Sequence, residues 1–402
     1  MPRARLPRHA LRTAEEPPPC ARTTHQPTTY RPTRRRARFR TRPAEPSWAR
    51  WRPRPPLLTA APATAAPASG TDTDTALSLV LLGTNSGPPP LAGRYGISSA
   101  LVVNGRTYVV DCGRGAVTQY LRAGLSMPSL AGIFLTHLHA DHIVDYYAFP
   151  LLSAGAAGDQ GFRTPVSVYG PGPAGIPSTV PGAPGPLPGT VEMTRLAGQA
   201  YAAAPTFFMT EHIGIDPATL LDVHDVLPPA SVAASATNTA PAMRPFTVME
   251  NDDVKVTAVL VPHGAVFPSY AYRFDTDHGS VVFSGDTTTT PNLITLARSS
   301  DVLVHEALYP AGLAGLGLPQ ALIDHILASH TDVAELGRIA AESDAGALVA
   351  THLSPGNPAA VSDATWRRLL RDSARRSGYG GRMLLGADLM RVPVRRANAR
   401  RG

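Results

Sequence analysis

The sequence is poor in cysteine, lysine, aromatic residues and charge. Only two cysteines occur among 402 residues, which excludes a disulfide scaffold. We expect Cys112 to be a small buried thiol, because it follows the apolar run at 107–111. No apolar run approaches the roughly 18 residues of a membrane-spanning helix, so we expect no membrane partner. Aromatic residues are 6% and charged residues 17% of the chain, against 41 prolines and 35 glycines, so part of it should lack a packed core.

Charge is distributed so unevenly that the net value of +7 is misleading. Residues 1–55 hold 15 arginines against three glutamates, and the last eight residues hold four more arginines, which leaves −9 on residues 56–394. The acidic body gives no reason to expect nucleic-acid binding by the folded part.

Composition divides the chain into three regions. Residues 1–75 are rich in Arg, Pro and Ala without hydrophobic periodicity and are interpreted as a disordered tail. The segment 34–39 resembles a twin-arginine signal, but arginines interrupt the apolar stretch that export requires. A solvated tail, a degenerate export signal and a nucleic-acid-binding arm are the alternatives. The compartment stays open: cytoplasmic, or exported if the tail is a degenerate twin-arginine signal. One domain is predicted at 76–394 and a basic tail at 395–402.

Hairpins followed by strand–helix alternation indicate an α/β layered domain over 76–394. An Asn104-Gly105 turn separates two early apolar runs and favours a type I′ hairpin. Segment 171–247 begins proline-rich, contains a predicted helix at 191–208, and is interpreted as an insertion. The later alternation predicts helices at 292–297, 332–343 and 363–377 and strands at 302–305 and 347–351.

The segment His137-Leu138-His139-Ala140-Asp141-His142 directly follows a predicted strand at 132–136. His137 and His139 are two residues apart, so on extended backbone both side chains point the same way. Asp141 and His142 then turn into the next helix. Nitrogen and oxygen donors at this spacing can serve two adjacent metal ions and suit zinc, although iron and manganese accept the same donors. Burying these groups without a partner is expensive, which favours a metal site over a structural cluster.

Three more polar residues follow later predicted strands: His263, Asp286 and His352. Strand ends converge at one edge of a sheet, so we expect these side chains to join the histidine cluster. The combined set would give each of two metals three terminal ligands and one shared carboxylate. Water between two such ions becomes a hydroxide nucleophile at neutral pH.

These residues resemble the motifs of the metallo-β-lactamase superfamily of binuclear metallohydrolases, over nearly all of 76–394. The resemblance implies a four-layer αβ/βα sandwich with the metals at one edge. It also implies that one metal is held by His137, His139 and His263, the other by Asp141, His142 and His352, and that Asp286 bridges them.

Within the superfamily the chain is most similar to ribonuclease Z and its arylsulfatase-like relatives. The similarity lies in Leu-Gly-Thr at 82–84, Asp-Cys-Gly at 111–113, and His305-Glu306-Ala307 followed by His330-Thr331. It implies that His330 protonates the leaving oxygen and that Glu306 orients it. A carboxylate bonded to imidazole fixes its tautomer and keeps it protonatable near neutral pH. The alternative is that His330 caps the helix predicted from 332.

The sequence also departs from ribonuclease Z. Its first loop keeps Arg94, a candidate for binding an anionic substrate, but lacks the family's Lys and Asn. Segment 160–250 carries a net charge of −3 where the family has a basic arm that grips tRNA. Transfer-RNA processing is therefore disfavoured.

The sequence predicts a hydrolase that uses two divalent ions, preferably zinc. A metal-bridging hydroxide would cleave a phosphodiester or sulfate ester of a small to medium organic substrate, with Asp141 orienting the nucleophile and His330 protonating the leaving group. The alternatives are a ribonuclease Z-like tRNA 3′-end endonuclease using the basic tail, a lactonase or β-lactamase-type acyl hydrolase, and a metal-binding module without catalysis. A homodimer is compatible with the resemblance. The substrate, the physiological metal and the true start of the chain stay open.

Overall fold

The computed structural model describes residues 76–182 and 185–396. The tail predicted at 1–75 and all but two residues of the basic tail predicted at 395–402 lie outside the described residues. No helix within the described ranges is long and apolar enough to cross a membrane.

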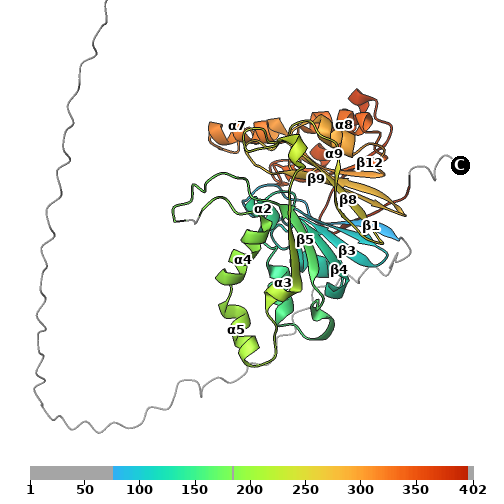
Figure 1. Ribbon diagram of the computed structural model, residues 1–402. Coiled ribbons are helices and arrows are strands. Elements are labelled where there is room, and N and C mark those ends of the chain that lie inside the picture. Colours follow the sequence, from blue (N-terminus) through green and yellow to red (C-terminus); the bar gives the residue numbers. More distant parts are fainter. Residues whose placement is uncertain (1–75, 183–184, 397–402) are drawn as a thin grey trace, which may run out of the picture. The chain divides into compact units, whose positions relative to one another are not determined.

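Two seven-stranded mixed sheets form the centre of the domain (Figure 1). The first sheet has the spatial order β14 (Met390–Pro393), β1 (Leu77–Gly83), β2 (Ser98–Val103), β3 (Arg106–Val110), β4 (Leu130–Phe134), β5 (Val166–Pro171) and β6 (Leu221–Val226). The second has the order β13 (Arg382–Leu385), β12 (Ala347–Ser354), β11 (Val302–Leu308), β10 (Gly279–Phe283), β9 (Tyr270–Thr276), β8 (Lys255–Leu260) and β7 (Phe246–Glu250).

Helices cover the outer faces of both sheets (Figure 1). On the first sheet the apolar layer includes residues of α1 (Ala116–Arg122), α3 (Ala148–Ala154) and α4 (Thr190–Ala200). On the second sheet it includes residues of α6 (Pro291–Leu296), α8 (Leu336–Glu342) and α9 (Asp363–Ser377). A third apolar layer, with Phe134 and Phe274, fills the space between the sheets. This arrangement confirms the four-layer αβ/βα sandwich.

Continuous apolar runs explain the central strands. Every residue of β1 is buried, as is usual where a strand is covered on both faces. The β2–β3 hairpin turns at Asn104 and Gly105, whose φ angles of 49° and 81° are both left-handed, as the predicted type I′ turn requires.

The predicted helix at 191–208 is wrong in one respect, because two helices occupy this segment. α4 ends at Ala200, and α5 (Ala203–Thr210) begins three residues later. Pro205 has no N–H for a continuous helix, but it is tolerated in the first turn of α5, where N–H groups need no intrahelical partner. The segment interpreted as an insertion also supplies β6, which pairs in parallel with β5.

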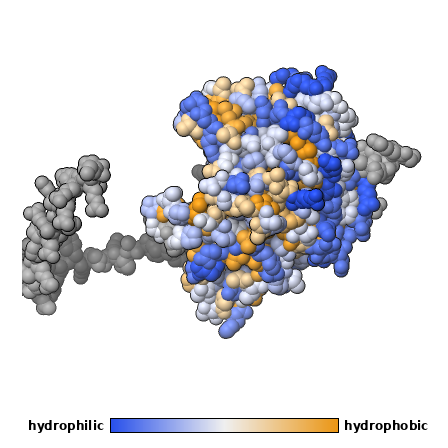
Figure 2. Space-filling view, turned by 45° about the horizontal axis from the view of Figure 1, so that its top comes forward, coloured by the Kyte–Doolittle hydropathy of each residue, from blue (hydrophilic) through white to orange (hydrophobic). Residues whose placement is uncertain are grey.

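Two short helices lie near the ends of the central strands. α2 (Ala140–Ile143) follows β4 through the histidine motif. No helix bounds were predicted for α7 (Gln320–Ser329), which lies at the upper left in Figure 1. The surface is hollowed between α7 and the loop that follows β5 (Figure 2). The hollow marks the sheet edge at which the predicted site residues gather.

Candidate metal centre

The histidine motif lies where β4 passes into α2. His139 has extended backbone and immediately precedes the helix, whereas Asp141 and His142 lie in its first turn. The other sheet brings His263 from the end of β8 and Asp286 from the end of β10. The site therefore spans both sheets.

Asp286 is the central acceptor of the cluster. Its Oδ2 atom lies 3.3 Å from His352 Nε2 and 3.4 Å from His142 Nε2. The same oxygen lies 3.8 Å from His263 Nε2 and 3.9 Å from His137 Nε2. One carboxylate oxygen thus faces imidazoles of both predicted ligand sets, the position that a bridging ligand would take.

The donor set fits metal ions. The ligand atoms of His137, His139 and His263 lie within 4.8 Å of one another, as do those of Asp141, His142 and His352. The buried Nε2 atoms of His137 and His142 have no hydrogen-bond partner among the described residues. Buried unpaired nitrogens are costly, and a cation would satisfy them. The structure brings together all seven predicted ligands.

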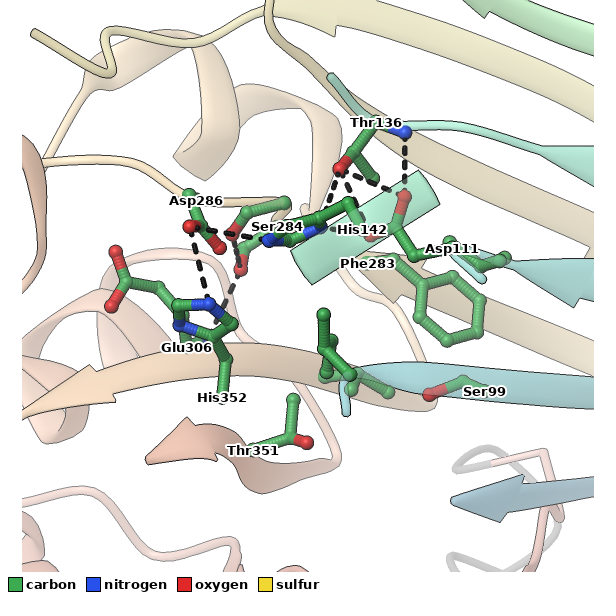
Figure 3. Close-up of a pocket in the computed structure, with 14 residues that line it drawn as sticks. Ser99, Asp111, Thr136, His142, Phe283, Ser284, Asp286, Glu306, Thr351 and His352 are labelled. Atoms are coloured by element: carbon green, nitrogen blue, oxygen red, sulfur yellow. Dashed lines mark hydrogen bonds and ion pairs between the residues drawn. The ribbon is translucent and has the colours of Figure 1, made fainter. Parts of the chain in front are cut away.

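Asp111 and Thr136 fix the tautomers of two of these histidines, of which Figure 3 shows His142. His142 Nδ1–H donates to Asp111 Oδ2 at 2.8 Å. Thr136 Oγ1 donates to Asp111 at 2.9 Å and so accepts from His137 Nδ1–H at 3.2 Å. On a third histidine, His263 Nδ1–H donates to the Ser329 carbonyl at 2.9 Å. Each Nε2 lone pair is left for a metal, as such supporting contacts do in metalloproteins.

Left-handed backbone occurs at two residues of the centre. Asp111 has a φ of 59° and His352 a φ of 43°. Non-glycine residues adopt this region at a cost of about 1–3 kcal/mol, and such residues cluster at functional sites. The surrounding fold holds both side chains in place in spite of that cost.

Burial and charge set the protonation of the cluster. Burial lowers the pKa of His139 to about 4 and also lowers the pKa values of His137 and His263. Burial also disfavours the charged form of His142, but Asp286 and Asp111 outweigh it and raise its pKa. Three ligands are thus neutral near pH 7, and a cation would displace the proton of the fourth.

Glu306 holds His330 beside the cluster. Its Oε1 atom accepts from His330 Nδ1–H at 3.0 Å and from the backbone N–H groups of Thr287 and Thr331 at 3.0 and 3.2 Å. Burial disfavours the charged imidazole, but Glu306 and other acidic neighbours outweigh it and raise the pKa of His330 to about 9. Asp332, not His330, caps the following one-turn helix through Ala334 N–H at 2.9 Å.

Arg94 does not face the metal centre, as binding an anionic substrate would require. Its guanidinium donates to the Gly356 carbonyl at 2.9 Å, to Thr84 Oγ1 at 3.1 Å and to Asp363 Oδ1 at 2.6 Å. Only 6% of the side chain is exposed. All three nitrogens are used inside the protein, so Arg94 ties a loop to α9 and is not available to a substrate.

Sequence reasoning missed the supporting residues. Asp111 belongs to a motif shared with the family, but the sequence alone assigns no role to it or to Thr136. The one available signal was that Asp111 ends an apolar strand with a carboxylate. Its role depends on β3 pairing in parallel with β4, which places the ends of the two strands side by side.

Two facing mixed sheets, helices on the outer faces and this histidine and aspartate cluster at one edge define a hydrolase of the metallo-β-lactamase fold. The chain is 31% identical over 318 residues to ribonuclease Z of Mycobacterium avium, covering 79% of this chain and 98% of that protein. The protein belongs to the ribonuclease Z family.

Other comparisons concern a further ribonuclease Z, the fold, and a family model that matches part of the chain. Ribonuclease Z of Mycobacterium marinum is 29% identical, and the match covers 79% of this chain and 99% of that protein. The crystal structure of human tRNase Z, short form, matches with a TM-score of 0.51 and 19% identity, covering 79% of this chain and 99% of that one, which supports the fold. The family model of the anti-Pycsar protein Apyc1 matches residues 77–149.

Proposed function

We propose that the protein is a binuclear zinc hydrolase that cleaves a phosphodiester or sulfate ester of a small to medium organic substrate. The main observation that supports this proposal is that His330, hydrogen-bonded to Glu306 at 3.0 Å, lies beside a cluster of seven candidate metal ligands. A metal-binding module without catalysis has no need of this pair, and neither do acyl transfers that need no protonated leaving group.

The seven candidate ligands would hold two metal ions. His137, His139 and His263 would hold one ion, Asp141, His142 and His352 the other, and Asp286 both. When bound, two such ions lower the pKa of water and stabilise negative charge on an ester.

Residues beside the ions would position the reactants. Asp141, fixed by the Gly87 N–H at 2.9 Å, would orient the attacking water. His330 donates its Nδ1 proton to Glu306, which leaves Nε2–H to protonate the departing oxygen.

A second candidate is tRNA 3′-end cleavage, which family membership favours. The match covers almost the whole length of the ribonuclease Z relatives. Polyanion binding needs several Lys and Arg contacts, and the body of this chain is acidic. The tail at 1–75 would have to supply them, so its deletion would abolish binding of a precursor tRNA and leave hydrolysis of small esters unchanged.

The test compares bis(p-nitrophenyl) phosphate with p-nitrophenyl sulfate, using the zinc-loaded full chain. The His142→Ala variant should lose hydrolysis, and the exposed His224→Ala variant should keep it. Zinc-dependent preference for either ester supports the proposal and identifies the ester. Hydrolysis of precursor tRNA alone would favour the second candidate, and no hydrolysis of any substrate would contradict both.

A further inference from the structure

Two apolar pockets flank the metal centre. The α7 pocket, of about 580 Å³, is lined by Leu322 and Ile326 of α7 and also by Pro88 and Pro89. The loop pocket, of about 600 Å³, is lined by Ile176, Leu187, Met193 and Phe267, among others. In Figure 2 the surface is hollowed between the corresponding segments, with apolar residues on both sides.

The two pockets meet at the cluster. His139 and His325 line both of them. The α7 pocket also contains Asp141, Asp286 and other predicted ligands. A molecule whose reacting atom lies at the ions would therefore have one apolar space on each side.

The linings match a ligand of low charge. Among the described residues, no Lys or Arg lines either pocket. Arg114 lines a separate, smaller cavity beside Asp141, and its Nη2 atom already donates to the carbonyls of Leu91 and Arg94. The positive charge facing a substrate would come from the ions, partly offset by Asp141 and Asp286, and from protonated His330, whose charge is offset by Glu306. Such a site matches a single negative charge between two apolar groups.

His330 distinguishes the two sides. It lines the α7 pocket and is not among the residues of the loop pocket. Its Nδ1 atom is bonded to Glu306, so the remaining Nε2–H is the proton it can give. The leaving oxygen must lie within reach of that proton, which places the leaving group on the α7 side.

We propose that the substrate is a phosphodiester with an apolar group on each side of phosphorus, the leaving group in the α7 pocket and the retained group in the loop pocket. This proposal rests on the proposed hydrolase function. A sulfate monoester has only one organic group and would leave the loop pocket unused.

The reaction is a simple hydrolysis. The oxygen of water forms the new bond to phosphorus, and the bond from phosphorus to the leaving oxygen breaks with its electron pair. The leaving oxygen takes a proton from His330, and the proton released by the water restores His330. The products are a phosphomonoester and an alcohol or phenol.

The test varies the retained group and keeps the leaving group constant. The zinc-loaded full chain is assayed with methyl, butyl and hexyl p-nitrophenyl phosphate. KM should fall about two- to fourfold per added methylene until the loop pocket is filled, with little change in kcat, because each methylene leaves water for an apolar wall. Calorimetry should show that dibutyl phosphate binds more tightly than dimethyl phosphate.

Three variants separate the pockets. Ile176→Ser, in the loop pocket, should flatten the dependence on retained-group length. Leu322→Ser, in the α7 pocket, should raise KM for every substrate and keep that dependence. Leu327→Ser is the matched control, because Leu327 is 44% exposed on the same helix and lines neither pocket.

The outcomes distinguish the two proposals. Hydrolysis with KM and dialkyl phosphate affinity independent of chain length would overturn the apolar diester and leave the hydrolase function standing. Chain-length-dependent binding of dialkyl phosphates without hydrolysis of any ester would overturn the hydrolase function and support the pockets.

Discussion

At the scale of single residues, Asp111 and Glu306 perform related tasks. Each is a buried carboxylate that accepts from an imidazole Nδ1–H, from His142 at 2.8 Å and from His330 at 3.0 Å. The first histidine is thereby turned toward the ligand cluster and the second toward the α7 pocket. Two similar hydrogen bonds would thus prepare one imidazole to bind metal and another to give up a proton, as proposed above.

Replacing Asp111 with Asn should weaken metal binding. The amide is a poorer acceptor for His142 Nδ1–H and no longer fixes its tautomer, so we expect zinc affinity to fall about 10- to 100-fold. Competition with a chromophoric chelator measures this affinity. Asp222→Asn, on the exposed face of β6, is the control. Equal affinity in both variants would show that Asp111 does not support the ligand.

Replacing His330 with Gln should affect poor leaving groups most. An alkoxide needs a proton as it departs, whereas p-nitrophenolate is stable without one. We expect kcat to fall about 100-fold or more for an alkyl leaving group and less than about tenfold for p-nitrophenolate. Steady-state assays of the two substrate types measure the difference. Equal losses would refute the role of His330 as general acid.

At the scale of elements, Arg94 joins the loop after β1 to the start of α9 through Asp363. The Arg94→Ala variant should lower the free energy of unfolding by about 1–3 kcal/mol, because buried partners lose their donor. KM should stay unchanged. Urea unfolding and steady-state kinetics measure the two quantities.

Arg367→Ala provides the matched control for this prediction. Arg367 faces the same carboxylate at 3.9 Å but is 57% exposed, so its loss should change stability by less than about 1 kcal/mol. A raised KM in Arg94→Ala without loss of stability would return Arg94 to the substrate site.

The elements differ in how well local sequence specifies them. Strands such as β11 and β12 and the amphipathic helix α9 were predicted because their apolar patterns are local. No helix bounds were predicted over 320–329, and in the structure only Ser329 of α7 is buried, so the apolar residues of this helix are not packed into a core. The metal motif was visible because its residues are adjacent in sequence. Its support by Asp111 was not, since that contact depends on the pairing of β3 with β4.

At the scale of the whole molecule, the histidines whose pKa values are lowered by burial, His137, His139 and His263, should make the metal-free protein sensitive to acid. The pKa of His139 falls from 6.5 to about 4 on folding, so the unfolded chain binds more protons between these values. Stability from this group is complete above pH 6.5 and is lost as the pH falls toward 4, with a slope of at most about 1.4 kcal/mol per pH unit. Zinc affinity should fall over the same range.

Urea unfolding of the metal-free protein at several pH values measures this dependence. The His139→Gln variant should show a shallower slope between pH 6.5 and 4, while His224→Gln, whose histidine lies on the exposed edge strand β6, should resemble the original protein. A His139→Gln slope as steep as the original would assign the acid sensitivity to other groups.

The ligands come from opposite halves of the sandwich. His137, His139, Asp141 and His142 follow a strand of the first sheet, whereas His263, Asp286 and His352 belong to the second. Bound ions would therefore act as a cross-link between positions as distant in the chain as 137 and 352. Separating the sheets would require breaking coordination bonds first, so a chelator should accelerate unfolding as well as stop hydrolysis. The proposed metal centre would therefore also stabilise the packing of the two halves of the domain against each other.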